Sequence, residues 1–209
     1  MINEIKNKIH TLVQKYEQGK EIYRTSRFNE TQVRNEFLDP LFEIFGWDIR
    51  NIAGKNTNER EVLLEEPLKA NAASHTKKPD YTFRLFGERK FFLEAKKPCV
   101  HIEREDNPAK QVRCYGFTAG LKISVLSNFE HLYIYDTSYP VEQNDTRSRQ
   151  LSVNTSTPIT KMPQRNFWRF LVRILCIQVT LMRSGVRSRQ TSITNRLMNS
   201  FYSRLTIGV

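Results

Sequence analysis

Hydrophobic side chains recur with a helical period at the start of the chain. In segment 3–24 they are spaced mostly three or four positions apart among Glu, Lys and Gln residues. Such a stripe is typical of an amphipathic helix that packs on the outside of a domain. Its apolar members are Ile5, Ile9, Leu12, Val13 and Tyr16.

A second helical pattern begins near Asn29 or Thr31 and meets Pro40. A proline inside a helix removes a backbone donor and crowds the preceding turn, whereas Asp at the cap and Pro at the first position start a helix well. The pattern therefore predicts two short helices joined at Asp39. Gly46 predicts the end of the second one.

Aromatic and alternating runs predict strands further along the chain. The strongest pair, 80–86 and 89–96, is separated by a short link containing Gly87 and is typical of a hairpin. The order of elements predicts an α/β domain, with a mixed central sheet flanked by helices. The other expected elements are a strand around 60–64, a helix at 108–121, and strands at 122–126 and 130–136.

The formal net charge of +11 first suggests a nucleic-acid partner. However, residues 146–209 hold ten Arg and Lys161 but no Asp or Glu, so the whole excess lies there and residues 1–145 are neutral. We therefore divide the chain into a domain at 1–145 and a basic tail at 146–209, which we expect to be irregular or helical. The charge of the tail says nothing about the function of the domain.

Two hypotheses account for the basic tail. One is that a frame slip or recombination in the coding sequence left a non-native or disordered segment. The other is a genuine DNA-binding arm or membrane-surface element, because arginines are embedded in the apolar segment 166–182.

Several protein classes are excluded by what the chain lacks. No uncharged stretch is long enough for a membrane span, and the N-terminus has no apolar core of a secretory signal, which predicts a cytoplasmic protein. Cys99, Cys114 and Cys176 are odd in number and widely spaced, so they predict neither a disulfide framework nor a zinc site.

The chemistry of the chain gathers on the predicted hairpin. Asp80 follows Pro79 at the start of one strand, and Glu94 and Lys96 share one face of the other because side chains alternate along a strand. If residue 85 pairs with 89 around a three-residue loop, Asp80 falls opposite Glu94. An ionised Glu in so apolar a strand is costly unless it is paired or bound to metal.

Oxygen ligands such as Asp80 and Glu94 suit Mg²⁺, with Mn²⁺ as an alternative. A metal held there would polarise a phosphodiester, and Lys96 would either orient or help deprotonate the attacking water. The alternative to a metal site is a surface hairpin with solvated charges, because Asp followed by Glu-x-Lys is a weak pattern by itself. Pro79, the hairpin and the apolar frame around Glu94 favour the metal site.

These motifs resemble the PD-(D/E)xK superfamily of nucleases. More narrowly, segments 31–48, 78–81, 91–98 and 126–136 resemble the N-terminal cleavage domain of type IIG restriction enzymes, and they are also similar to the N-terminal domain of type I restriction R subunits. The resemblance covers about residues 25–140. It implies a restriction-endonuclease-like core.

The resemblance implies roles for three further residues. Glu36 matches the position of an additional acidic group near the metal, and an exposed helix charge is an equally good interpretation. Gln111 and Tyr115, four residues apart on one helix face, match a pair that supports the active site or contacts DNA. Core packing is the alternative for Tyr115.

The resemblance also implies a function and its partners. We expect a Mg²⁺-dependent endonuclease that hydrolyses double-stranded DNA in a restriction-modification system, with methyltransferase and target-recognition modules outside this chain. One alternative is a catalytically silent DNA-binding or scaffolding domain, against which the intact Asp80, Glu94 and Lys96 argue. The other is a repair or recombination nuclease with the same core, because a fold does not fix a pathway.

Overall fold

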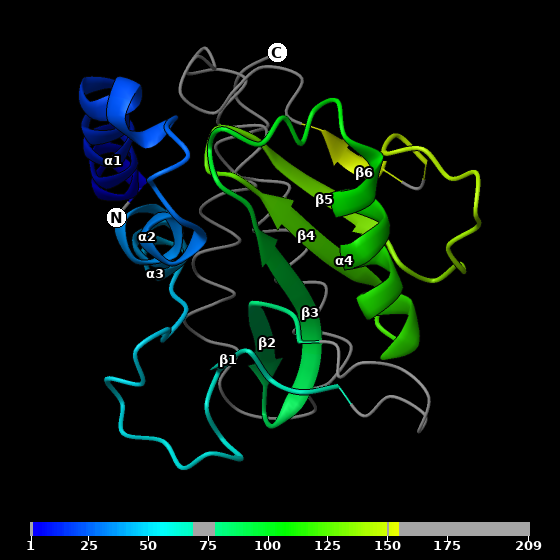
Figure 1. The fold of residues 1–209 in the computed structure, drawn as a ribbon. Helices are drawn as coiled ribbons and strands as arrows, with labels where there is room; N and C mark the ends of the chain where they lie inside the picture. Colours follow the sequence, from blue (N-terminus) through cyan, green and yellow to red (C-terminus); the bar gives the residue numbers. More distant parts are fainter. Residues whose placement is uncertain (1, 69–77, 150, 155–209) are drawn as a thin grey trace, which may run out of the picture. The chain divides into compact units, whose positions relative to one another are not determined.

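A six-stranded sheet forms the centre of the chain in a computed structural model that describes residues 2–68, 78–149 and 151–154 (Figure 1). The strands lie side by side in sequence order, and among these described strands only β3 and β4 pair in parallel. The sheet is therefore mixed, which confirms the predicted fold class. The strands are β1 (Val62–Leu64), β2 (Tyr81–Leu85), β3 (Glu88–Ala95), β4 (Ile123–Ser127), β5 (Leu132–Asp136) and β6 (Leu151–Asn154).

Helix α4 (Asp106–Thr118) makes the crossover that the parallel β3–β4 pair requires, and it covers one face of the sheet (Figure 1). Its Ala109 and Val112 pack against Leu126 of β4. The helix comes close to the sheet at Gly116, where a Cβ atom would collide with the side chain of Ser124. Because α4 is held this near to the strands, its polar side chains can reach the end of β3.

The N-terminal helices cover the opposite face. Phe91 of β3 contacts Trp47, whereas the next residue, Phe92, belongs to the cluster under α4, as alternation along a strand requires. The aromatic ring of Phe37 lies against Phe129, which places the helical segment on the sheet. This layer consists of α1 (Ile2–Tyr23), α2 (Glu30–Val33), η1 (Arg34–Leu38) and α3 (Asp39–Ile44).

The second predicted helix begins where the sequence indicates, because Asn29 and Gln32 form a reciprocal capping box. A helix boundary at Asp39 is also present, but Asp39 does not cap α3. Instead a π-helical turn, η1, runs directly into α3. The wider turn moves the carbonyl group of Glu36 away from the ring of Pro40, which removes the clash that an α-helix would produce there. Helix α3 ends before Gly46, whose φ of 93° confirms the predicted stop.

The hairpin of β2 and β3 differs from the prediction in its turn but not in its register at the site. Leu85 pairs with Glu88 around a two-residue turn, Phe86-Gly87, with φ of 54° and 80°. A bulge next to Phe83 then inserts one extra residue in β3. From there the pairing continues to Tyr81 and Leu93, which sets Asp80 opposite Glu94 as predicted.

The sheet continues beyond residue 145, because β6 pairs antiparallel with β5. Asp145 and Arg113 form an ion pair of 2.8 Å with both side chains fully buried, and Arg149 NH1 lies 2.7 Å from the other carboxylate oxygen. A strand at 151–154 was not predicted. The predicted division at 145 stays a prediction, and the rest of the tail, with Lys161, Cys176 and segment 166–182, lies outside the described residues.

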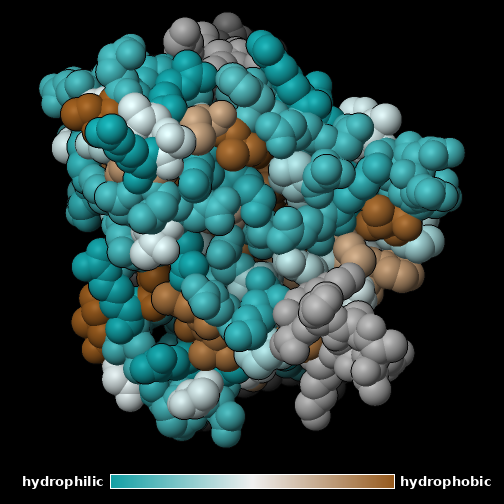
Figure 2. Space-filling model, viewed as in Figure 1, coloured by the Kyte–Doolittle hydropathy of each residue, from teal (hydrophilic) through white to brown (hydrophobic). Residues whose placement is uncertain are grey.

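The surface offers no single dominant hydrophobic area in the view of Figure 2, which is mostly hydrophilic with separate hydrophobic areas. No helix within the described ranges is long and apolar enough to cross a membrane. Cys99 and Cys114 form no disulfide in the part of the chain that the structure describes.

Candidate metal-binding site

Asp80 lies just before β2, at the end of the hairpin remote from its turn. Its Oδ2 accepts a hydrogen bond of 2.7 Å from the backbone N–H of Ala95, and its Oδ1 lies 3.3 Å from Arg34 NH1. Burial raises the pKa of Asp80 above its ordinary value, although the Ala95 N–H, Arg34 and Lys96 all favour the carboxylate. The carboxyl group is thus fixed in orientation by neighbours on both sides.

Glu94 points to the α4 face of the sheet and is 4% exposed. Its Oε1 accepts hydrogen bonds from Lys96 Nζ at 2.8 Å and Gln111 Nε2 at 2.7 Å. Its Oε2 is buried and has no hydrogen-bond partner among the residues that the structure describes. Burial, aided by the nearby charge of Asp80, raises the pKa of Glu94 to about 7. A buried carboxylate oxygen without a donor is costly, so this atom is available to a cation.

Lys96 follows β3, where its backbone N–H continues the pairing to Ser127 O at 2.9 Å. Besides Glu94, its Nζ has Glu30 Oε1 of α2 at 3.9 Å. Burial by itself lowers the pKa of Lys96, but the charges of Glu94, Glu30 and Asp80 outweigh it and raise the pKa above its ordinary value. The side chain is therefore an ammonium at neutral pH.

Gln111 and Tyr115 lie on the face of α4 that is turned to this group, as their spacing predicts. Gln111 Nε2 donates to Tyr115 OH at 2.8 Å as well as to Glu94. Tyr115 also packs against Phe92, so it takes part in both the hydrogen-bond chain and the core. The pair holds Glu94 in place from the α4 side.

Glu36 is the one predicted site residue that the structure does not bring to this group. Its Oε2 forms an ion pair of 3.1 Å with Lys15 of α1, and both side chains are partly exposed. Residues two apart on a helix point to different sides. Since Arg34 faces Asp80, Glu36 is turned away from it.

Sequence reasoning missed three charged residues that surround the carboxylates: Glu30, Arg34 and Glu65. Glu30 reaches Lys96 and Arg34 reaches Asp80, four residues apart on a helical segment. That spacing, counted from the cap at Asn29, was the available signal. Glu65, next to β1, forms an ion pair of 3.1 Å with Arg34 NH1, and nothing in the sequence indicates this contact.

The donor set fits a hard divalent cation. Within the described ranges no group of three or more His, Cys, Asp or Glu residues is arranged to hold a metal. Mg²⁺, however, takes one or two protein carboxylates and keeps several waters. Asp80 and Glu94 supply two, and the unpaired Glu94 Oε2 is an observation that points to a missing positive partner.

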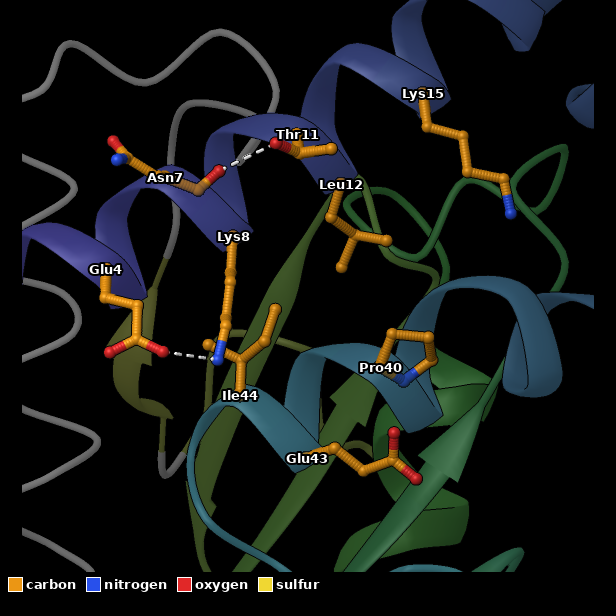
Figure 3. A pocket seen from close by; sticks show the side chains of 9 residues that line it. All are labelled: Glu4, Asn7, Lys8, Thr11, Leu12, Lys15, Pro40, Glu43 and Ile44. Atoms are coloured by element: carbon orange, nitrogen blue, oxygen red, sulfur yellow. Dashed lines mark hydrogen bonds and ion pairs between the residues drawn. The ribbon is translucent and has the colours of Figure 1, made fainter. Parts of the chain in front are cut away.

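A hollow of about 780 Å³ lies between α1 and α3 (Figure 3). Its walls carry Lys8, which is paired with Glu4 at 2.8 Å, and the aliphatic side chains of Leu12 and Ile44. None of the carboxylates around Lys96 lines it. We assign no chemistry to this hollow.

The pKa of Glu94 predicts how the stability of the metal-free chain depends on pH. The pKa of Glu94 is 4.5 in the unfolded chain and about 7 in the folded chain. The free energy of unfolding therefore falls as the pH rises between these two values. Gln cannot ionise, so at pH 8 the free energy of unfolding of Glu94→Gln is expected to exceed that of wild type by about 1–3 kcal/mol. At pH 5 the two free energies should differ little. Urea denaturation in EDTA at both pH values measures this, and a difference that does not change with pH would contradict it.

Comparison with known proteins connects this chain to a restriction-modification enzyme. The type II restriction enzyme and methyltransferase RM.Eco57I of Escherichia coli is 63% identical over 141 residues, which are 68% of this chain. The chain spans 14% of the length of that protein. No family model and no solved structure matches the chain. At this identity the chain is homologous to part of RM.Eco57I.

Proposed function

We propose, with this homology as the premise, that the chain carries a Mg²⁺-dependent endonuclease domain of the PD-(D/E)xK type that cleaves DNA in restriction-modification. The observation that carries the proposal is the meeting of Asp80, Glu94 and Lys96 at the end of the hairpin, where one buried oxygen of Glu94 has no partner within the described part of the chain. Two carboxylates and an ammonium at one place are the groups that metal-assisted phosphodiester hydrolysis needs. A silent scaffolding domain has no use for this costly arrangement.

Asp80 and Glu94 are the residues that would hold the metal. A bound Mg²⁺ supplies Lewis-acid polarisation of the phosphodiester and stabilises the charge on the leaving oxygen. The backbone N–H of Ala95 keeps Asp80 oriented, and Gln111 keeps Glu94 oriented from α4. Rigid placement of this kind matters because small misplacements of reacting groups cost large factors in rate.

Lys96 is assigned to orienting the attacking water and stabilising the charge that develops on the phosphate. In the metal-free chain the charges of Glu94, Glu30 and Asp80 raise the pKa of Lys96, so its side chain is an ammonium that donates hydrogen bonds. An ammonium on a flexible stem can follow the developing negative charge. Gln111 and Tyr115 support Glu94, and we propose no contact of either with DNA.

Double-stranded DNA is the proposed substrate. RM.Eco57I is by its name both a restriction enzyme and a methyltransferase, and this chain corresponds to a small part of it. We therefore propose that methylation and target recognition belong to modules other than the domain described here.

The test is incubation of the full chain with plasmid DNA and Mg²⁺, alongside Asp80→Ala and Lys96→Ala variants and an EDTA control. Wild type should nick or linearise the plasmid, and both variants should cleave it far more slowly or not at all. Cleavage that both substitutions leave unchanged would refute the site. Absence of cleavage by folded wild type, in Mg²⁺ and in Mn²⁺, would favour the silent scaffolding domain.

A further inference from the structure

Arg34 is a buried cation beside the proposed metal ligands. Its side chain is 10% exposed, and its NH1 atom lies 3.3 Å from Asp80 Oδ1 and 3.1 Å from Glu65 Oε1. The guanidinium also stands over the ring of Tyr81, 5.0 Å from its centroid. Arg34 is therefore held by two carboxylates and an aromatic face.

A π turn begins at Arg34. In η1 the backbone N–H of Asp39 bonds to the carbonyl oxygen of Arg34, five residues earlier, so the two side chains come to the same side of the helix. Tyr81 OH donates a hydrogen bond of 2.6 Å to Asp39 Oδ1. The Tyr81 ring, over which the Arg34 guanidinium stacks, is therefore held in place by a residue of the same helical segment.

Glu65 is joined to Asp80 twice. Its backbone N–H donates to Asp80 O at 3.1 Å, and its carboxylate pairs with the guanidinium that faces Asp80. The residue has a φ of 51°, a left-handed conformation that a non-glycine residue adopts at a cost. Its side chain is 62% exposed, so it can follow Arg34 if Arg34 moves.

Each proposed ligand thus has its own internal cation in the absence of metal: Lys96 for Glu94, and Arg34 for Asp80. We propose that Arg34 is the resident counter-ion of Asp80, which a divalent cation displaces, and that Glu65 retains Arg34 after the exchange. The inference rests on the proposed function in one respect, namely that Asp80 binds the metal. Arg34 is then a positioning residue. It lowers the affinity of the site for metal and stabilises the site when no metal is bound.

This role gives opposite effects on metal binding and on stability. Arg34→Gln removes a positive charge beside the metal, so the Kd for Mn²⁺ should fall about fivefold, while the melting temperature in EDTA should also fall because Asp80 loses its partner. Glu65→Gln should raise the Kd, since Arg34 is then left to Asp80 alone. In the Arg34→Gln background, Glu65→Gln should have no further effect on the Kd.

The experiment is isothermal titration calorimetry of the full chain with Mn²⁺, together with thermal melts in EDTA. Arg89→Gln is the matched control, because Arg89 pairs with Glu66 through two hydrogen bonds near the other end of β3. It should leave the Kd unchanged. Arg34→Lys, which keeps the charge, should keep a Kd near that of wild type even if its melting temperature falls.

The outcomes separate this inference from the proposed function. Failure of wild type to bind Mn²⁺, or binding that Asp80→Asn does not weaken, would overturn both. Normal binding by wild type, with a Kd for Arg34→Gln that is unchanged or higher, would overturn the role of Arg34 and leave the metal site standing. A Kd that Glu65→Gln raises equally with and without Arg34 would make Glu65 a direct ligand, which also contradicts the inference.

Discussion

Lys96→Ala is expected to slow DNA cleavage about 10²–10⁴-fold without weakening divalent-metal binding. The ammonium touches Glu94 but supplies no oxygen ligand, so its loss removes stabilisation of the reacting groups and not the metal site. Single-turnover cleavage of a plasmid measures the first effect, and calorimetry with Mn²⁺ measures the second. Their combination is specific to a residue that acts on the reaction.

A matched control is available on α4. Lys110 precedes Gln111, but its Nζ donates to Gln143 O at 3.0 Å and not to the site. Lys110→Ala should cleave at close to the wild-type rate. If Lys96→Ala lost metal binding as completely as Asp80→Asn, Lys96 would be required to build the site, and the role given to it here would be wrong.

Phe37→Ala is expected to lower the free energy of unfolding by about 3–5 kcal/mol, as deletion of a buried aromatic ring does. Phe37 is fully buried, and its ring lies 5.1 Å from that of Tyr16 and 4.8 Å from that of Phe129. It therefore joins α1, the π turn and the β4–β5 connection at one point. Loss of the ring loosens the same turn that holds Arg34.

Urea denaturation of the metal-free chain measures this effect. Phe117 serves as the control, because it lies on α4 with 43% of its surface exposed. Phe117→Ala should cost less than about 1 kcal/mol. A loss for Phe37→Ala no larger than that of the control would show that the N-terminal helices are not fixed to the sheet through this cluster.

The sheet side of the site could be predicted from the sequence, because strand alternation is a simple rule. It placed Glu94 and Lys96 together and Asp80 opposite Glu94. The predicted three-residue loop was wrong, since the turn has two residues. The bulge beside Phe83 adds one residue to β3, which compensates for the residue missing from the turn. The register at the site is therefore the predicted one.

The helical side could not be predicted in the same way. An α-helical period does not anticipate a π turn, which shifts the phase of every residue after it. The resemblance placed Glu36 near the metal, with an exposed helix charge as an equally good interpretation, whereas Glu30 and Arg34 are the residues that reach the site. The sequence feature that indicates a π turn here is Pro40 within a helical pattern, and this is a weak signal.

Strand β6 escaped prediction for a different reason. Residues 151–154 alternate between apolar and polar side chains, but only over four positions inside a segment rich in Ser, Thr, Asn and Arg, and the pairing with β5 depends on backbone hydrogen bonds that composition does not reveal. The nearby contacts of Arg113 and Arg149 with Asp145 tie its approach to the rest of the domain. The pair between Arg113 and Asp145 joins residues far apart in the sequence and has no local pattern, whereas Arg149 lies four residues after Asp145.

Because of the bulge in the hairpin, β3 can tolerate a change in length by one residue on one side of Phe91 but not on the other. Deletion of Lys90 would bring Arg89 and Phe91 next to each other, with their present partners Arg84 and Phe83 already adjacent on β2. The hairpin can therefore change by one residue at this point without moving the site. Between Phe91 and Lys96 there is no such freedom, because one added residue would turn Glu94 from α4 into the aromatic layer. Insertions and deletions among homologues should cluster on the turn side of Phe91.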